Sequence, residues 1–211
     1  EIKNVIDKAK LEGRLALTID ECIKVAKAAG IPMPKAVVAI SKEEAGEFAE
    51  KIGYPVVMKI VSPDILHKTD IGGVVLDVKS RSEAEENYEN LVRRSRIAIP
   101  NAKITGVLIQ EMVPSGKEII VGTVRDRQFG PLIMFGLGGI YVNFLRDVSY
   151  RLCPLTRSEA VEMIEETRAY SLLRGVRGEP PSDISSIVDV MLKMSQIMVR
   201  FEEISEMEIN P

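Results

Sequence analysis

Apolar residues in the first half of the chain recur with the periods of helices and strands. The segment TIDECIKVAKAAG repeats them every three to four positions, and the Gly30 and Pro32 that follow predict that the helix ends there. KAVVAI predicts a short strand, and Ser41 is the expected N-cap of a helix over KEEAGEFAEKIG that ends at Gly53. YPVVMKIV is apolar on both faces of a strand, which indicates a strand in the middle of a covered sheet.

The second half of the chain continues this mixture. GVVLDV predicts a strand and SRSEAEENYENLVRRSR an amphipathic helix, whereas ITGVLIQEMV and KEIIVGTVRD predict neighbouring strands joined through residues 114–116. GPLIMFGLGGIYVNFL indicates a strand followed by a glycine-rich turn. We then expect two helices, over residues 157–173 and from residue 182 or 183 onward, and EMEINP indicates a final strand.

The last expected helix carries an apolar stripe at helical spacing. Its methionines are expected to fill a core rather than to form a binding surface, and the stripe consists of Ile184, Ile187, Met191, Met194, Met198 and Phe201. Helices and strands are mixed along the chain, and several strands follow one another in its middle. The pattern therefore predicts an α+β fold of two lobes rather than a regular alternation of strand and helix.

Composition argues against several classes of partner. The 211 residues have a net charge of −3 without a basic tract, and there is no tryptophan, so nucleic acid is not an expected ligand. No apolar run approaches the roughly 20 residues of a membrane span, and the charged N-terminal segment lacks the apolar centre of a signal peptide. Cys22 and Cys153 show no metal-ligand spacing and are expected to be buried thiols in a reducing compartment, which predicts a cytoplasmic protein.

Lys59 is the first candidate for chemistry. Its ammonium group falls inside the apolar VVMKIV strand, where burial is costly unless an anion meets it. The side chain could reach water at the strand end or bind a phosphate group, and position alone favours neither. Gly136, Gly138 and Gly139 of FGLGGIYVN could offer backbone N–H groups to phosphate oxygens, although glycines after a strand usually form only a turn.

Two polar segments offer further candidate ligands. In QEMVPSGKE, a strand edge could present backbone groups to an adenine ring and Glu118 could hold a ribose hydroxyl, but taken alone a plain connection explains the segment better. Glu208 and Asn210 are two residues apart on the expected final strand, so they point to one face. A carboxylate and an amide oxygen suit Mg²⁺, while a polar strand face is the simpler explanation until a nucleotide is argued.

The chain has one histidine, His67, in the segment SPDILHKTDIGGV. A lone histidine is usually uninformative, and a structural one would more naturally lie on an apolar face with a fixed partner. His67 instead falls in a polar loop, between the strand that carries Lys59 and a glycine pair, Gly72–Gly73, that could act as a hinge.

Together these segments resemble an ATP-grasp domain and, more narrowly, the β subunits of ADP-forming acetate–CoA ligases (acetyl-CoA synthetases), which are relatives of succinyl-CoA synthetase. The resemblance rests, in family order, on GIPMPKAVVA, GYPVVMKIVSPDILHKTDIGGV, GVLIQEMVPSGKEIIVGTVRDRQFGPLIMFGLGGIYV, DVSYRLCPL and EMEINP, which cover nearly the whole chain. SPDILHKTDIGGV together with FGLGGIYV is specific to this group, whereas EINP is shared more widely.

The resemblance implies one ATP-grasp unit over residues 1–211, with mainly antiparallel sheets and flanking helices. It implies a smaller, nucleotide-covering lobe over residues 31–106 and a larger lobe over residues 107–211, with residues 1–30 packing on the larger lobe. ATP or ADP would bind between the sheets of the two lobes.

The resemblance also assigns roles to single residues. Lys59 would touch the nucleotide phosphates, with the glycines of FGLGGIYVN at the same ligand. The adenine ring would be received by Glu111, Met112 and Val113, and Glu118 would meet the ribose. Mg²⁺ would lie at Glu208 and Asn210, and His67 would be the phosphoryl-carrying histidine.

Two departures from the family pattern bear on function. Members normally continue beyond INP with a strand that carries a further acidic residue of the metal site, so we expect the Mg²⁺ site of this sequence to be incomplete. The family also needs an α subunit that binds CoA and carries its own active-site histidine. No such region is found here, so a CoA-binding partner subunit is expected.

The expected activity is that of the nucleotide-binding subunit of an ADP-forming acyl-CoA synthetase, working through phosphohistidine within a hetero-oligomer. Two alternatives stay open: an ATP-grasp carboxylate–amine ligase, which makes an acyl phosphate without histidine, and a non-catalytic nucleotide-sensing module. The presence together of Lys59, His67 and Glu208 argues against the sensing module. The sequence does not distinguish the preferred acid, ADP from GDP, or the stoichiometry of the assembly.

Overall fold

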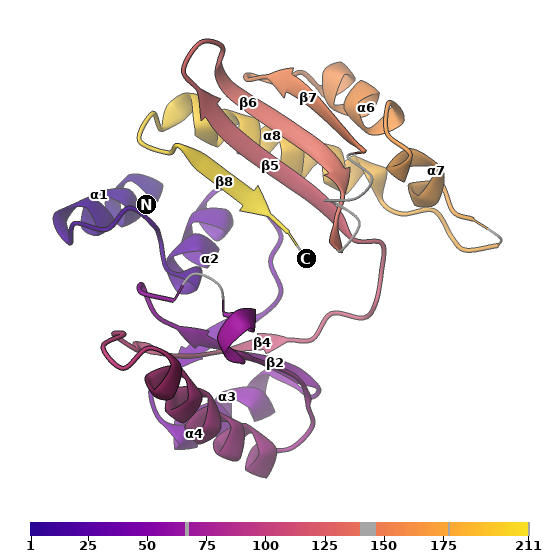
Figure 1. Ribbon diagram of the computed structural model, residues 1–211. Helices are drawn as coiled ribbons and strands as arrows, with labels where there is room; N and C mark the ends of the chain where they lie inside the picture. Colours follow the sequence, from indigo (N-terminus) through magenta and orange to yellow (C-terminus); the bar gives the residue numbers. More distant parts are fainter. Residues whose placement is uncertain (66–67, 140–146, 177, 211) are drawn as a thin grey trace. The chain divides into compact units, whose positions relative to one another are not determined.

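The computed structural model describes residues 1–65, 68–139, 147–176 and 178–210, and the chain divides into two compact units, Glu1–Pro114 and Ser115–Pro211. Each unit is built on one four-stranded antiparallel sheet with helices packed against it (Figure 1). The predicted α+β class with antiparallel sheets is confirmed. Within the described ranges, no helix has the length and apolar character needed to cross a membrane.

The first sheet has the strand order β1, β4, β2, β3. Its strands are β1 (Ala36–Ala39), β2 (Val56–Val61), β3 (Val74–Val78) and β4 (Gly106–Glu111). Strand β2 is central and is buried at every position except Lys59, as expected of a strand that is covered on both faces. The prediction of a central strand over YPVVMKIV is therefore confirmed.

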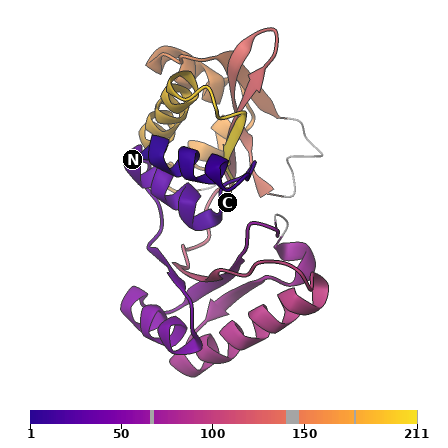
Figure 2. The same ribbon diagram turned by 90° about the vertical axis from the view of Figure 1, so that its left-hand side faces the viewer.

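Helices α3 (Lys42–Ile52) and α4 (Arg81–Ala98) lie side by side on one face of this sheet (Figures 1 and 2). Each is capped by a serine, Ser41 or Ser80, whose hydroxyl accepts a backbone N–H three residues on at 3.2 Å. Alternate strand residues pack beneath the two helices in one apolar core, which includes Ala45, Ala49, Val56, Met58, Ile60, Val107 and Ile109. Burial of this face sets the register of the sheet, because a slip of one residue would move every core side chain to the opposite face.

Helix α2 (Ile19–Ala28) packs on the opposite face of the first sheet, where Ile23 contacts Val61 and Leu108. It follows helix α1 (Ile2–Leu11), which the apolar pattern did not predict. The helix over TIDECIKVAKAAG is confirmed, and it covers part of the second face of the sheet.

The second sheet has the order β7 (Val148–Leu152), β6 (Gly130–Leu137), β5 (Ile119–Asp126), β8 (Glu206–Ile209). Helix α8 (Ile184–Arg200) and helix α6 (Arg157–Glu165) pack on one face of it. The predicted methionine stripe is part of this core, because the three methionines that are fully buried in α8 are Met191, Met194 and Met198.

Strands β4 and β5 follow one another in the chain but do not pair, so the prediction that they are neighbours is wrong. Strand β4 pairs with β1 and β2, and β5 pairs with β6 and β8. The reason is that Val107 and Ile109 of β4 complete the core beneath α3 and α4. The two compact units divide after Pro114, and residues 1–30 belong to the first of them, while the lobe bounds 31–106 and 107–211 stay predictions. The packing of residues 1–30 on the larger lobe stays a prediction.

The helix expected over residues 157–173 is in fact two helices, α6 and α7 (Ala169–Leu173). The Thr167 hydroxyl donates to the Ile164 carbonyl at 2.8 Å, which satisfies a carbonyl at the end of α6. The carboxylate of Asp147 then accepts the backbone N–H groups of Arg168 and Ala169 at 3.0 and 3.1 Å. A carboxylate at the start of α7 favours a new helix over a continued one.

The two cysteines are free thiols, and both were expected to be buried. Cys153 is half-buried, whereas Cys22 is exposed on α2, so the expectation of a buried Cys22 is wrong. Desolvation nevertheless raises the pKa of the Cys22 thiol. The thiol therefore stays protonated near neutral pH, which disfavours a role as a nucleophile.

Candidate functional site

Lys59 lies on the α2 face of the first sheet. It pairs with Leu108 of β4, and Leu108 contacts Ile23 of α2. The residues on either side of it in β2, Met58 and Ile60, point the other way into the core under α3 and α4. The ammonium group is therefore half-buried on the face of the sheet that α2 covers only in part.

Lys68 is the charged residue whose electrostatic effect changes the pKa of Lys59. Burial lowers the pKa of Lys59, and the positive charge of Lys68 lowers it further. Burial also lowers the pKa of Lys68, against a smaller opposing effect of Cys22. Throughout the part of the chain that the structure describes, neither lysine is in an ion pair with a carboxylate. Two half-buried cations without a counter-ion favour an anion site.

Sequence reasoning identified Lys59 and missed Lys68. A lysine in a polar loop is typical of a solvated surface, so nothing in its local pattern distinguished it. The available signal was its position next to His67 and before a glycine pair.

His67 itself lies outside the described residues, as does Leu66. The residues before them are held in place: the Asp64 carboxylate accepts the Lys103 backbone N–H at 2.7 Å, and Ile65 is buried in the core. After them, the Lys68 carbonyl accepts a backbone N–H from Gly73. The segment around His67 is thus attached to the first sheet on both sides.

Gly73 joins this segment to the strand that carries Lys59. Its N–H donates to the Lys68 carbonyl at 2.7 Å, and its carbonyl accepts the Ile60 N–H at 2.9 Å. A Cβ at this position would lie 2.8 Å from the Ile60 side chain and 2.9 Å from the Lys68 carbonyl. Only glycine allows so close an approach, and Gly72 before it has a φ of +65°. Through Gly73, the glycine pair predicted as a hinge also holds the Lys68 backbone close to β2.

Glu111, Met112 and Val113, the residues expected to receive adenine, lie where the chain leaves β4. The Glu111 N–H donates to the Lys35 carbonyl at 2.8 Å, and the Met112 N–H donates to the Pro55 carbonyl at 3.3 Å. Val113 is 59% exposed, and its N–H has no partner within the described residues. Of the three backbone N–H groups, that of Val113 is therefore the one available to a ligand.

In the second unit, Glu118 lies beside the glycine turn that follows β6. The Gly138 N–H donates to the Glu118 carbonyl at 2.9 Å. A Cβ on Gly139, which has a φ of +68°, would lie 2.1 Å from Glu118 Oε2, so the carboxylate lies against the backbone of Gly139. The structure thus brings Glu118 together with two predicted site glycines that follow it about 20 positions later in the chain.

Gly136 is placed differently. It lies inside β6, paired with Ile120 of β5 and Val148 of β7. A Cβ here would lie 2.7 Å from both the Asp147 carbonyl and the Val148 side chain. Close packing of β7 explains this glycine without a phosphate, so the phosphate contact expected at Gly136 stays a prediction.

Glu208 and Asn210 lie on and directly after β8, and both are exposed. Strand β8 runs antiparallel to β5 with Glu208 opposite Gly122, so its end lies at the same end of the sheet as Glu118. Neither side chain has a hydrogen-bond partner in the described part of the chain. Two unengaged oxygen ligands fit Mg²⁺, which keeps several waters and phosphate oxygens.

The described residues include no cluster of three or more acidic, histidine or cysteine side chains able to hold a metal ion. At this point the described residues offer one carboxylate and one amide oxygen, and water and phosphate oxygens would complete the coordination of Mg²⁺. This donor set suits Mg²⁺ bound with a nucleotide rather than a dedicated protein metal site.

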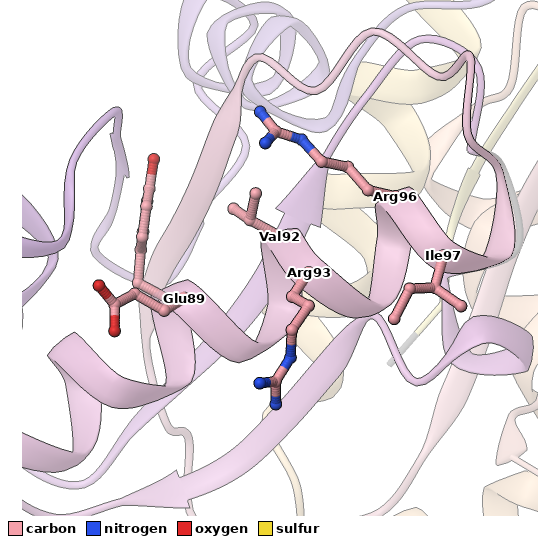
Figure 3. Close-up of a pocket in the computed structure, with 6 residues that line it drawn as sticks. Glu89, Val92, Arg93, Arg96 and Ile97 are labelled. Atoms are coloured by element: carbon pink, nitrogen blue, oxygen red, sulfur yellow. The ribbon is translucent and has the colours of Figure 1, made fainter.

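A surface depression of about 460 Å³ lies elsewhere, along α4 (Figure 3). Its lining comes from one helix and consists of Tyr88, Glu89, Val92, Arg93, Arg96 and Ile97. None of the predicted site residues borders it, and it is open to solvent rather than enclosed. It does not have the form of a nucleotide pocket.

Comparisons with known proteins point to one family. A family model described as an ATP-grasp domain matches residues 8–211. The β subunit of ADP-forming acetate–CoA ligase I from Pyrococcus furiosus is 47% identical over 209 residues, which are 99% of this chain and 90% of the relative. The chain is thus similar to that subunit over nearly its whole length.

Two solved structures of acetyl-coenzyme A synthetase 1 from Candidatus Korarchaeum cryptofilum also match. One, in complex with coenzyme A and Ca-AMPCP, has a TM-score of 0.96 at 44% identity and covers 100% of this chain and 92% of that one. The other contains coenzyme A and Mg-AMPPCP, and its phosphohistidine segment points towards the nucleotide-binding site. Its TM-score is 0.88 at 41% identity, with the same coverage.

Proposed function

Because the chain belongs to the ATP-grasp domain family, among the β subunits of ADP-forming acetate–CoA ligases, we propose that it is the nucleotide-binding subunit of an ADP-forming acyl-CoA synthetase. The net reaction is acyl-CoA + ADP + phosphate to free acid + CoA + ATP, and it is reversible. A phosphoryl group carried on His67 connects a partner subunit to the nucleotide.

The structural observation that carries this proposal is the state of Lys59. It is a half-buried ammonium group on a central strand, its pKa is lowered, and no carboxylate neutralises it within the described residues. A buried charge without a partner is costly, and the anion that best offsets the cost is a bound phosphate group. In this proposal Lys59 binds the nucleotide phosphates.

The other residues of the first unit have complementary roles. Glu111, Met112 and Val113 receive the adenine ring, and the unengaged Val113 N–H is the donor available to it. His67 is the nucleophile: a nitrogen of the neutral imidazole forms a P–N bond to the phosphorus of an acyl phosphate, and the carboxylate leaves. An oxygen of the ADP β-phosphate then attacks the same phosphorus, the P–N bond breaks, and ATP and free imidazole result.

In the second unit, Glu118 accepts a hydrogen bond from a ribose hydroxyl, and Gly138 and Gly139 lie at the phosphate oxygens. The Gly139 N–H is the donor in this proposal, because the Gly138 N–H is bonded to the Glu118 carbonyl. Glu208 and Asn210 would hold Mg²⁺, which offsets the negative charge of the phosphate groups when it is bound. Both roles are consistent with the common end of the sheet at which these residues lie.

The partner is a subunit that binds CoA and the acyl group. The Pyrococcus furiosus relative is named a β subunit, and none of the roles assigned to this chain concerns a thioester. Acid, CoA and acyl phosphate are therefore handled by the partner, and this chain handles the nucleotide. A cytoplasmic location stays a prediction.

Reconstitution tests the proposal. The complex is isolated through an affinity tag on this chain and assayed for ATP formation from acetyl-CoA, ADP and phosphate. We expect activity in the complex and none in the purified chain alone, because the chain lacks the acyl and CoA functions. Thioester-dependent ATP formation by the pure chain would contradict the two-subunit account. Nucleotide binding without turnover in the complex would favour a sensing module instead.

A further inference from the structure

We propose that Lys68 is a second phosphate-binding residue, which forms with Lys59 a two-cation site for the phosphate groups of the nucleotide. This inference rests on the proposed function for the identity of the anion. It adds a residue that the sequence motifs did not single out.

The backbone geometry places Lys68 next to the strand of Lys59. Its carbonyl is bonded to Gly73, and Gly73 is bonded in turn to Ile60, the residue that follows Lys59 in β2. Lys59 also pairs with Val74, the residue that follows Gly73. Two consecutive backbone links therefore fix the start of the Lys68 side chain close to β2.

The environment of Lys68 matches that of Lys59. Both side chains are half-buried, and burial disfavours the charged form of each. Two like charges held near each other in such a region repel, which costs further free energy unless an anion lies between them. A bound anion would remove this repulsion.

The acidic groups of α2, the helix whose Cys22 acts on the pKa of Lys68, do not provide that anion. Glu21 accepts two hydrogen bonds from Arg14 at 2.7 and 2.8 Å. Asp20 is paired with Lys24 at 3.2 Å and accepts the Thr18 hydroxyl. Each carboxylate is therefore already engaged with a partner of its own helix or of the segment before it.

Cys22 does not provide the anion either. It is the group whose charge acts on Lys68, but desolvation raises its pKa, so the thiol is neutral near pH 7. The counter-ion of Lys68 must therefore come from outside the described part of the chain. A phosphate chain with several negative charges is the ligand that two ammonium groups fit, each as a point charge with three donors.

The test compares the binding of Mg-ATP and of adenosine to the full-length chain, by titration calorimetry for the nucleotide and by NMR titration for the weaker nucleoside. In Lys68→Met we expect ATP affinity to fall by about tenfold or more, since one charge-assisted contact is lost. Adenosine affinity should stay within a factor of about two, because Lys68 contacts only phosphates. Lys59→Met should likewise lose affinity for ATP and keep its affinity for adenosine.

Two matched controls accompany this variant. Lys68→Arg keeps the positive charge and should recover most of the ATP affinity. Lys27→Met removes an exposed lysine of α2 and should change neither affinity. The fold of each variant is checked by circular dichroism, and an unfolded Lys68→Met would count against the inference, because the side chain is assigned no part in stabilising the fold.

Three results separate the possible failures. ATP affinity of Lys68→Met within about twofold of wild type would remove Lys68 from the phosphate site. An equal loss for ATP and adenosine would show that Lys68 only shapes the loop. Either result overturns the inference and leaves the proposed function in place, whereas a wild-type chain that does not bind ATP would overturn both.

Discussion

At the scale of single residues, two charged side chains that are removed from water differ in whether a counter-ion lies beside them. Glu21 is buried but has its counter-ion in Arg14, which is seven residues away and binds it through two guanidinium nitrogens. Lys59 is half-buried and has none within the described residues. A buried charge with a partner contributes to stability, whereas one without a partner indicates a ligand.

The stability contribution of Glu21 should depend on pH. Burial alone would raise its pKa, but hydrogen bonds from Arg14 and from the Thr18 N–H outweigh burial and lower the pKa from 4.5 to about 2. A lowered pKa means that the contribution is complete above pH 4.5 and is lost as the pH falls towards 2. Glu21→Gln should therefore lower the free energy of unfolding by about 2 kcal/mol at pH 7, and by less at pH 3.

Urea unfolding at the two pH values measures this effect, and Glu12→Gln is the matched control. Glu12 also pairs with Arg14, at 2.8 Å, but its side chain is 46% exposed, so its removal should cost less than about 0.5 kcal/mol. Equal losses for the two variants, or a Glu21 effect that is the same at pH 7 and pH 3, would show that the buried pair does not act as described.

At the scale of elements, the connection from α8 to β8 positions the predicted metal ligands. The guanidinium group of Arg125 on β5 donates to the carbonyls of Met198, Phe201 and Ile204. These carbonyls lie at and just beyond the C-terminal end of α8, where a helix leaves carbonyl groups unsatisfied. One side chain thus joins the end of α8 to the sheet, directly before the strand that carries Glu208.

Loss of this link should loosen β8 while the rest of the sheet stays ordered. In Arg125→Met, amide hydrogen exchange over residues 201–209 should be faster by about 10- to 100-fold, since two or three hydrogen bonds to a charged group are removed. Exchange in β6 should change little. Arg127→Met, in the same hairpin and exposed, is the control. Acceleration spread evenly over the second unit, or seen equally in Arg127→Met, would contradict this role.

The elements also show what the sequence can and cannot predict. Helices and strands with a strong local period, such as α3 over KEEAGEFAEKIG and β2 over YPVVMKIV, were predictable because capping and burial are local. The partner of a strand is not local. ITGVLIQEMV and KEIIVGTVRD are adjacent in sequence, yet β4 joins the core of α3 and α4, and β5 joins the other sheet. The break at Thr167 depends on Asp147, which is some 20 residues away.

In the candidate site, too, local features were predictable from the sequence and non-local ones were not. Lys59 could be predicted because a charge inside an apolar strand is anomalous within a window of six residues. Lys68 could not, because its burial and its effect on Lys59 arise only when Gly73 closes the loop onto β2. The contact of Glu118 with Gly139 likewise depends on the pairing of β5 with β6.

At the scale of the whole molecule, the proposed division of labour requires a mobile phosphoryl group. In this proposal acyl phosphate forms on the partner subunit and ATP forms on this chain, so two sites in different subunits must share one phosphoryl group. A histidine meets this need, because its phosphoramidate keeps enough transfer potential to make ATP. His67 is the one histidine of the chain, so the account depends on it.

The most direct test of this account is transfer of label from ATP to His67 in the complex with the partner subunit. Wild type treated with γ-labelled ATP should carry acid-labile, base-stable label on this chain, as phosphohistidine does. His67→Ala should lose that label and all acid-dependent turnover while it binds Mg-ATP within about twofold of wild type, because the change removes chemistry and not binding. If His67→Ala keeps full turnover with its partner, His67 does not carry the phosphoryl group and the relay is wrong.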